Sequence, residues 1–140
     1  MSTQKSVLIV DDVAFARKVL KDMISTSRNY NVIGEAANGY EAIIKTKQLK
    51  PEIIILDVVM PKMGGTEAAR KILEDNKEVK IVMMSSLMHE HLLMEAVNAG
   101  ARDFIAKPFS TEDIISSLDK VTEGDTGESQ AGGAAKGKAS

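Results

Sequence analysis

Short apolar runs recur along this chain, and each of them ends in a polar or charged residue. The most regular run covers residues 53–56, and Asp57 follows it directly. An unbroken run of β-branched and other apolar residues is typical of a strand buried on both faces, as in a parallel sheet. Turn-forming residues, Pro61, Gly64 and Gly65, break the pattern soon afterwards. We therefore expect the Asp57 carboxylate at the carboxyl end of a central strand.

Similar runs predict four more strands, over residues 7–10, 31–35, 80–85 and 103–106. Between and after the strands, apolar residues at helical spacing predict helices over 13–26, 40–49, 66–74, 90–99 and from Ser110 or Thr111 to about 121. Strands that alternate with helices predict an α/β fold, a doubly wound (βα)5 domain with a parallel sheet and right-handed crossovers. Residues 1–122 would form this single domain. Residues 123–140, rich in Gly, Ala, Ser and Lys, are expected to be a disordered tail, and a plain tail is favoured over a linker to another domain.

Composition narrows the function without defining it. The 140 residues carry a net charge of −2. The chain as a whole therefore has no strong positive charge that would favour nucleic acid or an anionic membrane as a partner. The chain has no cysteine, which excludes disulfides, thiolate metal sites and thiol catalysis. The apolar runs are too short to span a bilayer, and no signal-peptide pattern is present. We expect a cytoplasmic protein.

The strand ends carry the candidate chemistry: Asp11 and Asp12, Asp57, Ser85 and Lys107. In an open parallel sheet these ends meet at the edge where ligands bind. Three carboxylates need compensating positive charge, because like charges disfavour the ionised form. Lys107 supplies one cation, and an all-oxygen ligand set selects a hard divalent ion, Mg²⁺ or Mn²⁺, for the other. A carboxylate beside a metal, a lysine and a hydroxyl suits phosphoryl transfer.

Each of these residues also has an ordinary interpretation. Asp12 can act as a helix N-cap, and a lone lysine is usually solvated. His89 and His91 suggest a metal site, but residues two apart do not share a helix face, so we expect an exposed helix start. Six methionines are interpreted mainly as core filler: Met60, Met63, Met83, Met84, Met88 and Met94. On the first helix, Arg17, Lys18 and Lys21 either contact a histidine-bearing partner or form a solvated face.

The sequence resembles the receiver domain of two-component response regulators, most of all stand-alone chemotaxis regulators of the CheY type. The resemblance covers about residues 6–121 and rests on four stretches in family order: 8–12 (LIVDD), 57–65 (DVVMPKMGG), 81–86 (IVMMSS) and 100–109 (GARDFIAKPF). It implies a flavodoxin-like sheet in the order 2-1-3-4-5. It also implies a monomeric signalling switch that catalyses only its own phosphorylation and dephosphorylation, and so is not a conventional enzyme.

By this resemblance Asp57 accepts a phosphoryl group from a histidine kinase. Asp12, Asp57 and the backbone carbonyl of Val59 would bind Mg²⁺ directly, and Asp11 would bind it through water. The phosphate-binding set would be Ser85, Ser86 and Lys107, with a cis peptide bond between Lys107 and Pro108.

The resemblance further implies a switch formed by Ser85 and Phe104, in which the aromatic ring turns into space that Ser85 vacates. Without the family, Phe104 would be read as an ordinary core aromatic. The face formed by residues 88–99, Phe104 and the last helix is the candidate output surface, for a partner such as a motor switch component. A phosphatase partner stays open.

The chain departs from the family pattern at several positions. Gly64 replaces the acid usual before Gly65, which should leave that loop more mobile. Val59 and Leu87 stand at variable positions beside the path of hydrolytic water, and both are apolar. We therefore expect slow self-dephosphorylation.

Other functions remain open at this point. A phosphorelay intermediate or phosphate sink would use the same chemistry as a motility regulator. An aspartate-nucleophile, Mg²⁺-dependent phosphatase would need a cap over its substrate, and the sequence has no such insertion. An FMN carrier would need a phosphate loop after the first strand, where Asp11 and Asp12 would repel the phosphate.

Overall fold

The computed structural model describes residues 4–87 and 89–123. Strands and helices alternate along the chain as the sequence predicts. The strands are β1 (Lys5–Val10), β2 (Tyr30–Ala36), β3 (Ile53–Asp57), β4 (Lys80–Ser85) and β5 (Asp103–Ala106). The helices are α1 (Ala14–Ile24), α2 (Gly39–Leu49), α3 (Gly65–Asp75), α4 (Glu90–Asn98) and α5 (Thr111–Val121).

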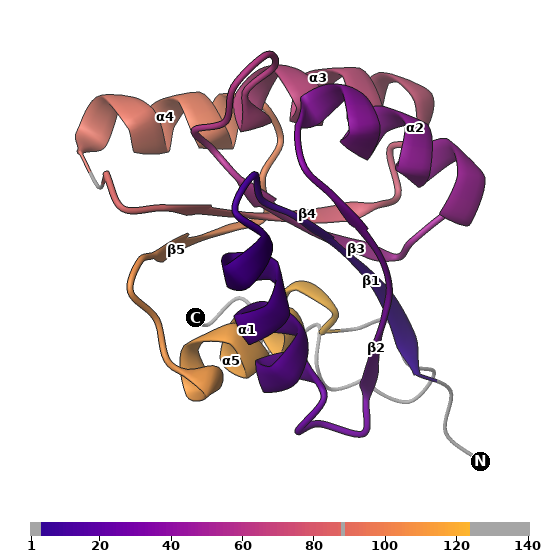
Figure 1. Cartoon of the computed structure of the whole chain (residues 1–140). Helices are drawn as coiled ribbons and strands as arrows, with labels where there is room; N and C mark the ends of the chain where they lie inside the picture. The colour runs from indigo at the N-terminus through magenta and orange to yellow at the C-terminus, as the bar shows by residue number, and fades with distance from the viewer. Residues whose placement is uncertain (1–3, 88, 124–140) are drawn as a thin grey trace.

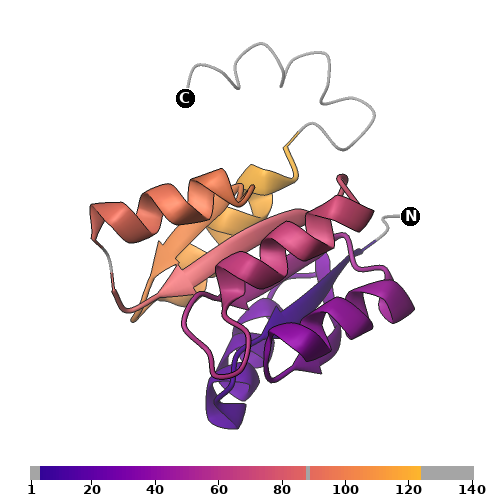
Figure 2. The same cartoon turned by 90° about the horizontal axis from the view of Figure 1, so that it is seen from above.

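The five strands form one parallel sheet in the order β2-β1-β3-β4-β5, which confirms the predicted flavodoxin-like topology. Helices α2, α3 and α4 cover one face, and α1 and α5 cover the other (Figure 1). Seen from above, α4, α3 and α2 lie side by side in front of the sheet (Figure 2). Strand β3 lies in the centre, so all its residues are buried. This burial explains why its sequence is apolar without alternation.

Each central strand divides its side chains between two cores. On the side of α2, α3 and α4 the strands contribute Leu8, Val10, Ile54, Leu56, Ile81 and Met83. On the side of α1 and α5 they contribute Val7, Ile9, Ile53, Ile55, Val82 and Met84. Successive residues point to opposite faces, so an uninterrupted apolar run is needed to fill both cores. Each of these side chains stabilises the fold by about 1.5–3 kcal/mol through burial.

The helix ends follow local chemistry. Ser110 and Asp113 form a reciprocal capping box at the start of α5, where the sequence predicts that the helix begins. Gly100 follows the end of α4 with φ +103°, a conformation that favours glycine. Helix α1 is shorter than predicted: Ser25 Oγ donates to the Asp22 carbonyl, and this local bond competes with further helix.

The methionines differ in their burial. Met63, Met83 and Met84 are buried and Met60 packs against the core, as expected of filler, but Met94 is 54% exposed on α4, so that assignment is wrong. Met88 and residues 124–140 of the expected tail lie outside the described residues. Among the described residues, no helix is long and apolar enough to cross a membrane.

Candidate functional site

Three carboxylates meet at the carboxyl edge of the sheet. Asp11 and Asp12 follow β1, and Asp57 is the last residue of β3, which pairs with β1. One oxygen from each of the three lies within 4.8 Å of the others. Because parallel neighbouring strands end at the same edge, two distant segments of sequence deliver their acids to one place. The predicted cluster is therefore present.

Asp11 is fully buried and fixed by its surroundings. Its Oδ1 accepts a hydrogen bond from the Val13 backbone N–H at 2.9 Å, and its own N–H donates to the Ala36 carbonyl at 3.1 Å. Val13 is the extended N-cap residue of α1 and makes no side-chain cap. The suggestion that Asp12 caps this helix is thus wrong, because Asp11 occupies the turn and leaves the Asp12 carboxylate exposed.

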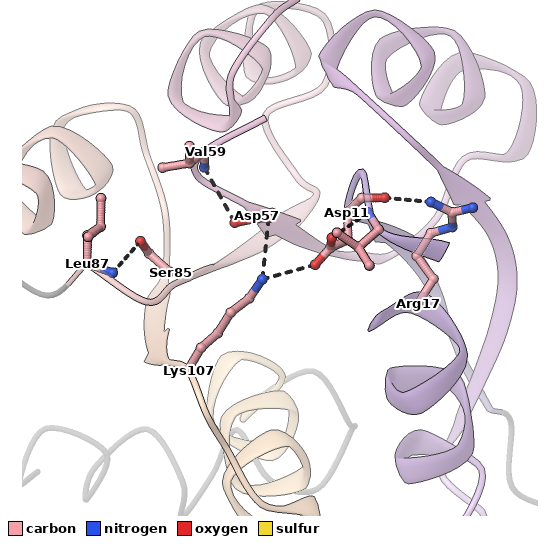
Figure 3. A network of polar contacts seen from close by, with 8 residues as sticks. Asp11, Arg17, Asp57, Val59, Ser85, Leu87 and Lys107 are labelled. Carbon is pink, nitrogen blue, oxygen red and sulfur yellow. Dashed lines mark hydrogen bonds and ion pairs between the residues drawn. The ribbon is translucent and has the colours of Figure 1, made fainter. Parts of the chain in front are cut away.

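Lys107 lies between the two buried acids (Figure 3). Its Nζ donates to Asp11 Oδ2 at 3.1 Å and to Asp57 Oδ2 at 3.4 Å. The lysine follows β5, and its backbone N–H donates to the Ser85 carbonyl at 2.9 Å. The Lys107–Pro108 peptide bond is cis, as the resemblance implies. The edge of the sheet thus brings an ammonium group to the carboxylates.

These charges shift each other's ionisation. Burial raises the pKa of Asp57; the Lys107 ammonium opposes this effect, and the neighbouring Asp11 carboxylate adds to it. For Lys107, burial alone would lower the pKa, but the hydrogen bond to Asp11 and the charges of Asp57 and Asp11 outweigh it and raise the pKa. The lysine therefore remains a cation, and further positive charge near Asp57 would favour its ionised form.

Ser85 and Ser86 differ in position. Ser85 is buried, and its Oγ accepts the Leu87 backbone N–H at 2.9 Å. Ser86 is exposed and lines a hollow together with Lys107. Val59 donates its N–H to Asp57 Oδ1 at 3.4 Å. The side chains of Val59 and Leu87 are 56% and 50% exposed, and both lie beside the site (Figure 3).

The turn after β3 depends on Gly65. Its N–H donates to the Val58 carbonyl at 2.8 Å, where α3 begins. A Cβ at this position would lie 2.3 Å from the carbonyl oxygen of Asp57. Only the absence of a side chain lets α3 start this close to the backbone of the candidate phosphoacceptor.

Phe104 lies on β5, and the two histidines lie at the start of α4. Phe104 is partly buried and packs against the core beneath α2, α3 and α4. Its turning inward toward Ser85 stays a prediction. His89 is the N-cap of α4 and accepts the Leu92 N–H, and His91 pairs with Glu95 at 3.3 Å. Both are exposed at the helix start, as expected.

The donor set fits a hard divalent ion. Asp11, Asp12 and Asp57 offer oxygens only, and no histidine or cysteine belongs to the group. The raised pKa of Asp57 has the acid beside it as one of its causes, so a cation bound between them would relieve that repulsion. Both observations favour a hard divalent ion such as Mg²⁺ or Mn²⁺ at this cluster.

Sequence reasoning missed one contact to the site. Arg17 was expected to contact a partner or solvent, but its Nη1 donates to the Asp11 carbonyl at 2.6 Å and its Nε to Glu35 at 2.8 Å (Figure 3). Its side chain is only 18% exposed. The spacing of Arg17 one helical turn after Val13 was available in the sequence. Its acidic partner on β2 was not, because the pairing depends on the fold.

The doubly wound sheet, with three carboxylates and a lysine at its carboxyl edge, fits the architecture expected of a receiver domain. The family model described as the response regulator receiver domain matches residues 7–119. The chain belongs to the response regulator receiver family. Such CheY-like domains are signalling domains rather than conventional enzymes, and membership implies phosphorylation-dependent two-component signalling.

Individual relatives support the same family. The chain is 45% identical over 119 residues to the chemotaxis protein CheY of Thermotoga maritima, covering 85% of this chain and 98% of the relative. The CheX–CheY–BeF3–Mg²⁺ complex of Borrelia burgdorferi is similar with a TM-score of 0.79, 35% identity and coverage of 84% and 88%. Vibrio cholerae CheY4 gives a TM-score of 0.79 at 29% identity, with coverage of 85% and 99%.

Proposed function

We propose that this protein is a signalling switch that accepts a phosphoryl group from a histidine kinase onto Asp57, with Mg²⁺ bound beside it. The observation that carries the proposal is the position of the Asp57 carboxylate, within 4.8 Å of oxygens from Asp11 and Asp12 and 3.4 Å from Lys107 Nζ. Asp11, Asp12, Asp57 and the Val59 carbonyl would hold the ion. When bound, Mg²⁺ offsets negative charge on the phosphoryl oxygens.

The residues divide the phosphoryl transfer between them. An Asp57 carboxylate oxygen forms the new bond to phosphorus while the bond from phosphorus to the donor imidazole nitrogen breaks, and the imidazole keeps that electron pair. Lys107, a cation already directed at Asp57, would then pair with a phosphoryl oxygen. The Ser85 hydroxyl would donate to another, and exposed Ser86 would line the approach.

The response to phosphorylation would begin at Ser85. Its Oγ is engaged by the Leu87 N–H, so donation to a phosphoryl group would draw the segment after β4 toward Asp57. We propose that Phe104 then turns inward and reshapes the surface of α4, β5 and α5. On α4, Met94 and Val97 are 54% and 65% exposed, which supports an apolar contact with an output protein.

The kinase would approach over α1. A hollow of about 400 Å³ lies between α1 and the segment after β5, lined by Phe15, Ser86, Lys107, Pro108 and others. Phe15 is 72% exposed at its rim. An apolar rim beside a phosphoacceptor suits docking of a histidine-bearing domain, with the imidazole directed at Asp57.

Chemotaxis is the favoured pathway, with a motor switch component as the output partner. This rests on the similarity to the Thermotoga maritima chemotaxis protein over nearly its full length. The Borrelia burgdorferi relative was solved in a complex with CheX, BeF3 and Mg²⁺, which supports a metal-dependent phosphoryl site. A phosphatase remains a further proposed partner. A phosphorelay intermediate or phosphate sink would share Asp57 chemistry but would not gain affinity for an output protein on phosphorylation.

The deciding experiment is incubation with acetyl phosphate and Mg²⁺, followed by intact-mass measurement. Wild type should gain the mass of one phosphoryl group, and chelation of Mg²⁺ should prevent it. Asp57→Asn should gain none, whereas the matched control Asp75→Asn, at the far end of α3, should behave as wild type. An adduct that persists in Asp57→Asn would move the acceptor elsewhere. Absence of any adduct, also with a histidine kinase as donor, would reject phosphoacceptor function.

A further inference from the structure

Arg17 ties the backbone that carries the acidic pair to a neighbouring strand. It lies in the first turn of α1, where its N–H donates to the Val13 carbonyl. Its guanidinium donates to the Asp11 carbonyl at 2.6 Å and to Glu35 Oε1 on β2 at 2.8 Å. A planar guanidinium can make both bonds at once in fixed directions. The arginine therefore fixes the Asp11 carbonyl relative to β2.

Glu35 is itself held in place. Lys21 Nζ lies 2.9 Å from its second carboxylate oxygen, and Lys45 Nζ donates to its backbone carbonyl at 3.0 Å. Hydrogen bonds from Lys21 and Arg17 lower the pKa of Glu35, so its carboxylate stays charged. The acceptor for Arg17 is thus anchored from α1 and α2 as well as from its own strand.

The tie matters most for Asp12. The Asp11 carbonyl and the Asp12 N–H belong to one planar peptide unit, so fixing the carbonyl direction also fixes the orientation of the next Cα. The Asp11 carboxylate has its own partners, Val13 and Lys107. Within residues 4–87 and 89–123, the Asp12 carboxylate makes no hydrogen bond or ion pair. The backbone of Asp12 therefore sets which positions its carboxylate can reach.

We propose that Arg17 is a positioning residue for the metal site: by holding the Asp11 carbonyl it directs the Asp12 carboxylate toward Mg²⁺. This inference rests on the proposed function, because it assumes that the cluster binds Mg²⁺. Residues that orient metal ligands typically change metal affinity by about 10-fold to 100-fold when they are replaced.

Charge alone makes the opposite prediction. Arg17 is a cation near a site for a divalent cation, so its removal should strengthen Mg²⁺ binding by simple electrostatics. Lys21 provides the matched control, since it pairs with the same Glu35 carboxylate and does not reach Asp11. Arg17→Lys keeps the charge but replaces the fork with a single ammonium group.

The test is an NMR titration of Mg²⁺ into wild type, Arg17→Met, Arg17→Lys and Lys21→Met, with urea unfolding of each protein as a check of folding. Both Arg17 variants should bind Mg²⁺ about 10-fold more weakly or worse, and Lys21→Met should stay close to wild type. In an Asp12→Asn background, Arg17→Met should add little further loss.

Folded Arg17 variants that bind Mg²⁺ as well as wild type would overturn the inference, and so would an equal loss in Lys21→Met. If Arg17→Met does not fold, Arg17→Lys decides the question. Wild type that binds no Mg²⁺ would overturn both this inference and the metal-dependent function. Suppose that wild type binds Mg²⁺ and gains the Asp57 adduct, but Arg17→Lys binds Mg²⁺ with unchanged affinity. That result would overturn the inference about Arg17 and leave the proposed function standing.

Discussion

Lys107 Nζ lies 3.4 Å from Asp57 Oδ2, although 50 residues separate them in the sequence. The side chain of Asp57 is 9% exposed and that of Lys107 is 28% exposed, so the pair is largely shielded from water. In such a place a lone charge is costly, and a lone carboxylate with a second acid beside it is costlier still. The lysine therefore contributes to stability as well as to the proposed chemistry.

Replacing Lys107 by Met should destabilise the fold by about 2 kcal/mol in the absence of Mg²⁺, because two buried carboxylates lose their cation. Part of this loss should be recovered at saturating Mg²⁺, which would supply positive charge to the same acids. Urea unfolding with and without Mg²⁺ measures both effects. Lys71→Met, at an exposed position on α3, is the control and should change little. If Mg²⁺ does not reduce the destabilisation of Lys107→Met, then Lys107 and Mg²⁺ do not act on the same carboxylates.

Asp57→Asn should have the opposite effect on the metal-free protein. The native pKa of Asp57 is raised above its usual 3.8, so folding works against its ionised form. This cost is fully present above the native pKa and absent below pH 3.8, where the carboxyl group is protonated in both states. We expect Asp57→Asn to be more stable than wild type at pH 7, because the amide carries no charge to desolvate.

Urea unfolding at pH 7 and near pH 3 tests this sign, and the gain should vanish at the lower pH. Saturating Mg²⁺ should narrow or reverse the difference at pH 7, because wild type keeps all three carboxylates for the ion. If Asp57→Asn were less stable than wild type at pH 7 without Mg²⁺, the ionised Asp57 would not destabilise the folded state, contrary to its raised pKa.

The central strand and its acid could be predicted because their signals are local. A double-sided apolar run followed by Asp57 and a turn defines both the strand and the position of the carboxylate. The same logic placed Asp11 and Lys107. Because the parallel topology brings all the strand ends to one edge, it also predicts that these side chains lie close together.

Other features could not be predicted because they depend on contacts between distant elements. The burial of Arg17 follows from Glu35, which only the pairing of β1 with β2 brings close. The choice of Asp11 rather than Asp12 as the partner of Val13 follows from the direction in which the chain leaves β1. Neither relation has a signature in hydrophobic periodicity.

Gly65→Ala should damage the site through its backbone. The added Cβ would lie 2.3 Å from the Asp57 carbonyl oxygen and 2.9 Å from the Val58 Cα, so either β3 or α3 must shift. We expect a loss of about 1–3 kcal/mol in the free energy of unfolding and slower phosphorylation of Asp57. Gly64→Ala is the control, because its Cβ would meet only the Val58 carbonyl, at 3.2 Å. Equal effects of the two substitutions would show that close packing at Gly65 is not the cause.

The final prediction concerns the lifetime of the phosphorylated state. Val59 and Leu87 expose apolar side chains beside the site, and neither can orient a water molecule toward phosphorus. Val59→Asn combined with Leu87→Glu would supply an amide and a carboxylate there. Dephosphorylation should accelerate by about tenfold, which corresponds to about 1.4 kcal/mol of barrier.

Loss of the phosphoryl adduct over time, followed by intact mass, measures the rate. Val59→Ala with Leu87→Ala separates the two possible causes of a change, because it opens the same space without a polar group. If the alanine pair accelerates hydrolysis as much as the polar pair, access of water limits the reaction and its orientation does not. If neither pair changes the lifetime, the apolar flank is irrelevant and slow self-dephosphorylation has another origin. If only the polar pair accelerates hydrolysis, the residues at positions 59 and 87 determine how long Asp57 stays phosphorylated.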